Sequence, residues 1–245
     1  MKEYLAILLL IIPYSIFAQT DKGLELSVEG SHKFTKSLSA SIGVELRTCE
    51  DFTAMTWDRG SIGVGATYKL GKHLKLSAGY NFLLDQNEEK INLDDDGVPY
   101  NWRPSYYGAR HRFNAALTGD VDLGRFNVSL RERWQYTYRP EKVCERFDFE
   151  DGEWEEKTIG SKAKNQLRSR LQVEYNIRKC PLTPFASIEV YNTDMLEKVR
   201  YAAGASWKIS KKQSLDFFYR YQNVRDADDD EPSRHTIGAS YNIKF

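Results

Sequence analysis

The sequence predicts an all-β protein, an antiparallel transmembrane β-barrel of the outer-membrane type with 10–12 strands. Apolar and polar residues alternate with period two along almost the whole chain after residue 20, which is typical of strands with one apolar and one polar face. The alternating segments 125–139 and 162–178 are far longer than the ~5–6 residues usual in soluble sheets. Aromatic residues make up 13 % of the chain, as expected for the aromatic girdles of such barrels.

Residues 1–18 predict a secretory signal peptide, and residues 19–245 are expected to form the barrel. Lys2 precedes an apolar run over residues 5–12, and small residues lead to Ala18, after which we expect cleavage. The run is too short for a transmembrane helix, which needs ~20 apolar residues. We therefore expect export to the outer membrane.

The strands are predicted, in order, from runs of alternating residues separated by turn signals. They cover residues 24–33, 38–47, 61–70, 73–82, 108–123, 125–139, 162–178, 183–191, 198–209, 214–223 and 233–245. Short connections alternate with long ones such as 48–59, 85–107 and 140–161. Short turns are expected at the periplasmic end and long loops outside the cell.

The strand count raises a parity problem at segment 24–33. Ten strands from residue 38 onward start and end at the periplasmic side, and bacterial barrels usually have an even count. Segment 24–33 would be the eleventh strand. Three explanations stay open: the segment is not a full strand, it runs inside the lumen, or a twelfth strand has been merged elsewhere. Ten is the preferred count.

The composition sets the wider context. The chain has 35 basic and 35 acidic residues, so net charge gives no reason to expect a nucleic-acid partner. Its mean hydropathy of −0.59 fits a barrel because half of each strand faces a polar lumen. Cys49, Cys144 and Cys180 are too few for a disulfide framework. A Cys49–Cys144 pair and three free thiols are both possible, and no cofactor is expected.

The inward positions are rich in charge, with more arginine than carboxylate. Arginine forms planar, multiply bonded pairs with carboxylates. The lumen is therefore either a salt-bridge network that fills a small barrel, or a narrow channel or pore that prefers anions or small solutes. The candidate lumen-lining residues are Glu45, Arg47, Arg110, Arg112, Arg131, Arg133, Arg168, Arg170, Glu174, Glu189, Arg200 and Arg220.

One charge conflicts with this alternation. Glu132 falls on the apolar side of segment 125–139, between Leu130 and Trp134. A charge facing lipid is costly at mid-depth and tolerable near an interface. Either a bulge changes the phase of the strand there, or Glu132 lies near a rim.

No catalytic residues and no metal site are predicted. Asn92, Asp94 and Asp96 partly match a calcium loop, but Arg103 stands where the final Glu is expected. His235 beside the acidic run 228–230 is the best acid–base grouping for the second alternative, an outer-membrane hydrolase.

Several stretches carry a family resemblance. They are "SASIGVELR", "RHRFNAALTGDVDLGRFNVSLRERWQYTYR", "NQLRSRLQVEYN", "PFASIEVYNT" and "VRYAAGASWKISKKQSLDFFYRYQ". Their order resembles an uncharacterised outer-membrane barrel family, domain of unknown function 2490, common in Bacteroidetes. The resemblance covers nearly all of the expected mature chain. It implies an outer-membrane barrel and no activity, because none is assigned to the family.

The last segment alternates up to Phe245, with Tyr241 and Ile243 on the same side. This pattern resembles the C-terminal signal that outer-membrane assembly machinery reads. That machinery and outer-membrane lipid are the expected partners, and the oligomeric state is open. The expected function is that of an outer-membrane barrel of unassigned role.

Overall fold

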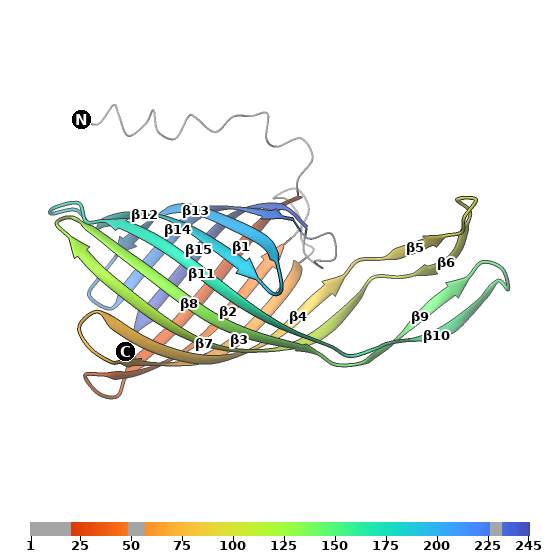
Figure 1. Ribbon diagram of the computed structural model, residues 1–245, viewed down its shortest axis with the longest axis horizontal. Helices are drawn as coiled ribbons and strands as arrows, with labels where there is room; N and C mark the ends of the chain where they lie inside the picture. The colour runs from red at the N-terminus through yellow and green to blue at the C-terminus, as the bar shows by residue number, and fades with distance from the viewer. Residues whose placement is uncertain (1–20, 49–56, 226–231) are drawn as a thin grey trace, which may run out of the picture.

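Within the residues that the computed structural model describes (21–48, 57–225 and 232–245), eleven strands close into one barrel. Figure 1 shows the barrel with its axis roughly horizontal. The barrel strands are β1 (Asp21–Lys33), β2 (Leu38–Thr48), β3 (Trp57–Lys69), β4 (Leu74–Asn87), β7 (Tyr106–Leu123), β8 (Phe126–Arg139), β11 (Lys162–Tyr175), β12 (Leu182–Asn192), β13 (Leu196–Lys208), β14 (Gln213–Val224) and β15 (Arg234–Lys244). The predicted fold class is confirmed.

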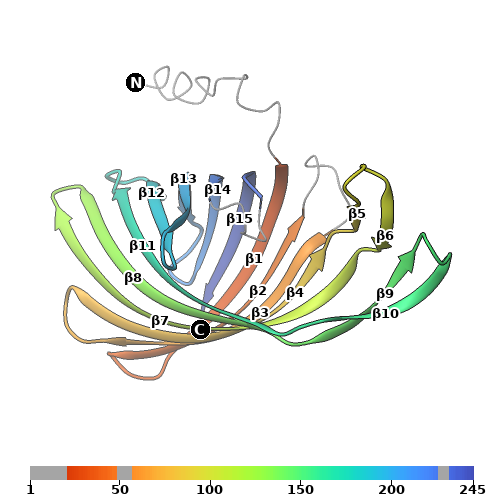
Figure 2. The same ribbon diagram turned by 45° about the vertical axis from the view of Figure 1, so that its right-hand side comes forward.

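The barrel closes through a parallel pair. β1 is antiparallel to β2 but parallel to β15, in unbroken register from Asp21 opposite Arg234 to Ser31 opposite Lys244, and Figure 2 shows β1 and β15 side by side. An odd number of strands cannot alternate in direction all the way round, so one neighbouring pair must be parallel. Segment 24–33 is therefore a full strand, and the preferred count of ten was one short.

The two longest connections contain strands of their own, which the sequence analysis placed in loops. β5 (Lys90–Leu93), β6 (Pro99–Arg103), β9 (Lys142–Asp148) and β10 (Glu153–Ile159) pair in the order β10-β9-β6-β5. This sheet projects beyond one end of the barrel (Figure 1). Its strands are short and rich in charge, so the period-two signal was weak. The predicted loop 48–59 also loses its last residues, which belong to β3.

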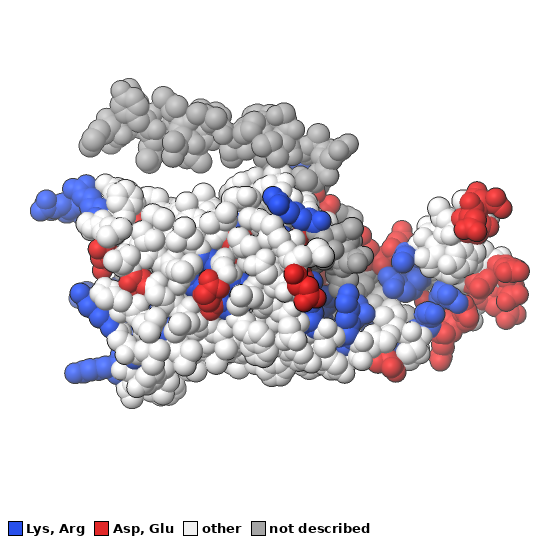
Figure 3. Space-filling model, in the orientation of Figure 1, with Lys and Arg blue, Asp and Glu red and all other residues white. Residues whose placement is uncertain are grey.

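The outer wall of the barrel is apolar. Large hydrophobic side chains on its strands are exposed at Leu26, Val44, Ile62, Leu76, Phe113, Leu130, Trp134, Leu171, Ile188, Tyr201, Phe217 and Ile237. Figure 3 shows a mostly uncharged wall with a few charged side chains on it, and more charged side chains at the ends and on the projecting sheet. This is the lipid-facing band of a transmembrane barrel. No helix among the described residues is long and apolar enough to span a membrane.

The interior is polar. Among the described residues, four hydrophobic side chains are buried, against seventeen polar or charged ones. A soluble domain shows the opposite balance. The hydrogen-bonded core of this protein is therefore its lumen.

Glu132 faces the outer wall without a bulge. β8 keeps continuous register with both neighbours, β7 and β11, so the phase of the strand does not change. Glu132 lies opposite Ser169, whose hydroxyl donates a 2.6 Å hydrogen bond to its carboxylate.

Three expectations rest on residues outside the described ones. They are the signal peptide at residues 1–18, the acidic run 228–230 beside His235, and the pairing of Cys49. Cys144 and Cys180 carry free thiols.

Candidate functional site

Three cavities follow one another along the part of the lumen that the structure describes. The lower cavity, of about 490 Å³, reaches the short-turn end at Glu174 and Lys208. The upper cavity, of about 540 Å³, reaches the opposite end at Glu88 and Lys90. The waist, of about 220 Å³, shares lining residues with both. The waist is the smallest of these three cavities.

The candidate lumen residues all line these cavities. The waist takes Glu45, Arg47, Arg112, Arg133, Arg168, Arg200 and Arg220. The lower cavity takes Arg131, Arg170, Glu174 and Glu189, and the upper one takes Arg110. Eight basic and two acidic side chains line the waist, so basic side chains outnumber acidic ones on its wall, although three of them pair with carboxylates outside it.

Four arginines form a two-by-two array on adjacent strands. Arg131 and Arg133 of β8 lie directly opposite Arg170 and Arg168 of β11. Like charges directly opposite one another destabilise a strand pair. We call these four residues the arginine array.

Glu189 of β12 is the carboxylate that holds this array together. It accepts hydrogen bonds from Arg131 Nη2 at 2.7 Å, from Arg168 Nη2 at 3.0 Å and from the Tyr191 hydroxyl at 2.9 Å. Its exposed fraction is only 7 %. Burial strengthens such charge-assisted bonds because water no longer competes for them.

The other two arginines of the array have no such partner. Among the described residues, neither Arg133 nor Arg170 makes a hydrogen bond or an ion pair, and Arg133 Nε is buried. Taking a charge out of water costs several kcal/mol unless a counter-charge compensates. Both guanidiniums border the lower cavity, where a bound anion would supply that counter-charge.

Tyr191 fixes the guanidiniums beside the array. Its side chain is 2 % exposed and lies between Arg168, with Cζ 4.5 Å from the ring centroid, and Arg200, at 4.7 Å. Arg200 Nη1 also donates a hydrogen bond to the Tyr191 hydroxyl. Cation–π contacts and hydrogen bonds together hold these side chains in one geometry. The sequence analysis missed Tyr191, although an aromatic residue two positions after Glu189 occupies an inward position.

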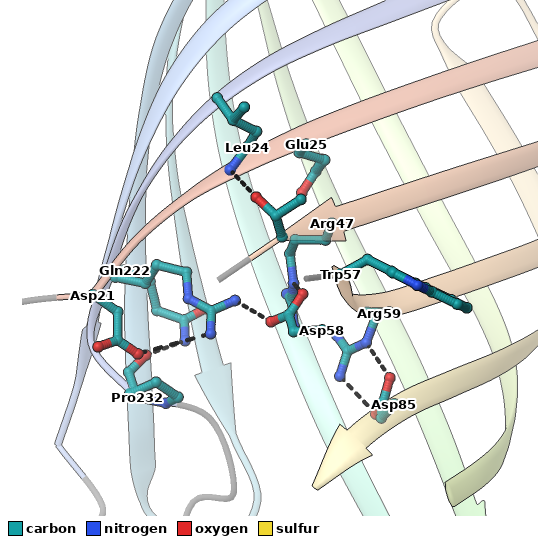
Figure 4. Close-up of polar contacts among 12 residues, drawn as sticks. Asp21, Leu24, Glu25, Arg47, Trp57, Asp58, Arg59, Asp85, Gln222 and Pro232 are labelled. Carbon is teal, nitrogen blue, oxygen red and sulfur yellow. Dashed lines mark hydrogen bonds and ion pairs between the residues drawn. The ribbon is translucent and has the colours of Figure 1, made fainter. Parts of the chain in front are cut away.

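Ion pairs link the side chains that line the upper cavity (Figure 4). Asp58 pairs with Arg47 at 3.2 Å and also with Arg234. Asp85 accepts a 2.8 Å bond from Arg59 and lies 2.9 Å from Arg110.

A further pair, between Glu25 and Arg220, ties β1 to β14 across the parallel seam. Glu25 belongs to the segment whose status as a strand was open. Asp58, Arg59 and Asp85 were placed in loops, so the sequence analysis missed these partners.

The wall formed by β1 to β4 is lined by small residues. A space of about 390 Å³ borders Ser41, Gly43, Ser61, Gly63, Gly65, Ser77 and Gly79, and also reaches Arg133. Small side chains cannot fill the lumen from this side. The arginine array therefore borders open space as well as packed wall.

The remaining candidates have local structural partners. The Asp94 carboxylate accepts the backbone N–H groups of Asp96 at 3.0 Å and Val98 at 2.8 Å, which is the geometry of a turn. Asn92 donates to Asn101. No group of three or more His, Cys, Asp or Glu side chains in the described part of the chain could hold a metal ion.

The residues at the end of β15 lie on the outer wall, because they alternate with the lumen-lining Ser240 and Asn242. Phe245 is 68 % exposed, and its N–H donates to the Ser31 carbonyl at 2.9 Å. The role of Tyr241, Ile243 and Phe245 in assembly stays a prediction.

Long tilted strands, an apolar outer band and a charged lumen define the class of this protein: an outer-membrane β-barrel. The family described as "Protein of unknown function (DUF2490)" matches residues 26–232, and the chain belongs to this family.

Two solved structures share the fold. The β domain of the Bordetella autotransporter BrkA has a TM-score of 0.56 at 13 % identity, with 87 % of this chain and 86 % of that chain covered. The translocator domain of the autotransporter NalP from Neisseria meningitidis has a TM-score of 0.54 at 12 % identity, with 84 % and 73 % covered. The KdgM porin has a TM-score of 0.44 at 14 % identity, with 90 % and 96 % covered. No curated protein matches the sequence.

Proposed function

We propose that this protein is a narrow pathway for small anions across the outer membrane, and that the arginine array sets its selectivity. The observation that carries the proposal is that Arg133 and Arg170 border a cavity and make no ion pair with a carboxylate among the described residues. A lumen filled by a salt-bridge network would pair both of these half-buried guanidiniums with carboxylates.

The distribution of charge supports this proposal. The upper cavity is lined by six basic and five acidic side chains, so its charges nearly cancel. The waist has eight basic and two acidic side chains. Rings of one charge in a narrow passage set ion selectivity, and a cationic waist favours anions over cations.

The size of the passage restricts the solutes. The waist has a volume of about 220 Å³, which is below the ~300–1,000 Å³ typical of sites for drug-sized ligands. Small anions fit such a space, whereas a folded protein does not. The proposal includes export directed by residues 1–18.

The hydrolase alternative gains no support from the described residues. His111 and His235 are at outward positions of their strands, where they contact the hydroxyls of Tyr80 and Tyr219. Neither histidine borders the cavities described above. We therefore propose no catalytic role.

The proposal is tested by planar-bilayer recording of the purified protein in a KCl gradient. The native reversal potential should indicate preference for Cl⁻, and Arg133→Gln combined with Arg170→Gln should reduce that preference. The matched control is Arg146→Gln with Arg178→Gln, which removes two positive charges outside these cavities. Absence of any current from folded, heat-modifiable protein would show that the lumen is closed and would refute the proposal.

A further inference from the structure

Two phenylalanines break the polar pattern of the lumen. Phe185 of β12 and Phe218 of β14 occupy inward positions and line the lower cavity together with the arginine array. Most other residues around this cavity are charged, polar or small. Large apolar rings are unexpected in a water-filled passage, because leaving apolar surface in water costs roughly 25 cal/mol per Å².

Glycines allow the two rings to lie along the wall. Phe185, Gly204, Phe218 and Gly238 are direct neighbours across four consecutive strands. A Cβ at Gly238 would lie 2.1 Å from Phe218 Cζ, and one at Gly204 would lie 2.9 Å from Phe185 Cζ. The rings therefore occupy the space that side chains at Gly204 and Gly238 would take. Both phenylalanines are only half-buried, so apolar surface borders the cavity.

We propose that the lower cavity is a binding site for an organic oxyanion with a ring or other flat apolar part. This inference rests on the proposed function and names the class of solute. A carboxylate or phosphate would bind to Arg133 and Arg170, because a guanidinium pairs with such groups in a planar, bidentate manner. The ring would pack on Phe185 and Phe218, where offset or edge-to-face contacts are favourable.

The dimensions and the local charges agree with this assignment. The cavity volume of about 490 Å³ lies within the range of small-molecule sites, ~300–1,000 Å³. Arg220 lies where the apolar and the charged parts of the cavity meet. Its Cζ lies 5.6 Å from the Phe218 ring centroid, and its guanidinium pairs with Glu25. An inorganic anion would use the arginines alone and would leave both rings in water.

The test compares ligands with and without a ring. Benzoate and phenyl phosphate are titrated against acetate and inorganic phosphate as blockers of the Cl⁻ current through the native protein. Covering ~60 Å² of ring surface corresponds to about a tenfold tighter binding. We therefore expect each ring-bearing ligand to block at about one tenth of the concentration that its ringless partner requires.

The variants separate the rings from the arginines. Phe185→Ala with Phe218→Ala should abolish the tenfold difference while the preference for Cl⁻ over K⁺ stays native. Phe217→Ala, on the lipid-facing side of the same strand, is the matched control and should keep the difference. If the alanine variant does not fold, Phe185→Leu with Phe218→Leu keeps most of the volume and should still reduce the difference.

Two outcomes would overturn the inference. Equal block by ring-bearing and ringless ligands in the native protein would show that the rings do not contact the solute. An unchanged difference in the folded phenylalanine variants would place the apolar contact elsewhere. In both cases anion selectivity that depends on Arg133 and Arg170 would still support the proposed function, so the two failures are distinguishable.

Discussion

Replacing Glu189 by Gln should lower the stability of the protein and increase its preference for anions. The substitution keeps the shape of the side chain and removes the charge that Arg131 and Arg168 share. Both arginines would then stand opposite other arginines with no carboxylate between them. Because breaking a buried ion pair costs ~3–5 kcal/mol, and one amide oxygen can still accept a bond, we expect a loss of ~3 kcal/mol in the free energy of unfolding.

The same substitution should increase the preference for anions. A unit negative charge ~7 Å from an ion repels Cl⁻ and attracts K⁺ by ~0.6 kcal/mol each at the dielectric constant of water. The difference of ~1.2 kcal/mol corresponds to about a sevenfold change in the ratio of permeabilities. Removing a negative charge from the wall of the lower cavity should therefore raise the Cl⁻/K⁺ permeability ratio by up to about sevenfold. A variant that was merely less stable would not show this increase.

The two readouts are urea unfolding in lipid vesicles, followed by Trp fluorescence, and the reversal potential in planar bilayers. Glu174→Gln is the matched control for stability, because it removes the same charge from the wall of the same cavity. Glu174 accepts a hydrogen bond from Gln172 and has no arginine partner among the described residues. It should leave stability within ~0.5 kcal/mol of native. Native stability of Glu189→Gln would refute the role assigned to this carboxylate.

Three further predictions concern the barrel itself. Gly204→Ala should lower the free energy of unfolding by ~1–3 kcal/mol, because the new Cβ would lie 2.2 Å from a backbone carbonyl oxygen. Gly71→Ala is the control and should be neutral, because a Cβ there meets nothing within 4 Å. Glu132→Leu should raise it by ~1 kcal/mol in vesicles, since a carboxylate is removed from the lipid-facing wall; a lower value would contradict that placement. Leu26→Cys with Ala239→Cys, directly opposite each other in β1 and β15, should cross-link when the three native cysteines are absent, and failure to do so would contradict the parallel seam.

The fold class was accessible from the sequence because a transmembrane strand repeats one simple rule. Lipid requires apolar residues at every second position, and segments such as 162–178 keep that pattern over many residues. The inward faces of those strands follow from the same alternation. This is why Arg168 and Arg170, two positions apart, were assigned to one face.

The parallel pairing of β1 with β15 and the ion-pair partners of the lumen arginines could not be predicted from this alternation. Alternation shows which face a residue occupies and says nothing about the direction of the neighbouring strand, so the parallel pairing of β1 with β15 could not be read from it. Asp58 and Asp85 lie near the ends of β3 and β4, where alternation gives way to loop-like composition. Their arginine partners come from other strands, up to 176 residues away in the chain.

The two walls of the lumen together favour the proposed hollow barrel over a filled one. A salt-bridge network that fills the lumen needs long side chains of both signs on all sides. β8 and β11 provide four arginines, but β2, β3 and β4 face them mainly with serine and glycine. One carboxylate, Glu189, bonds directly to two of the four. Such a lumen has more basic than acidic side chains and unfilled space at the same level, which is what the proposed anion pathway requires.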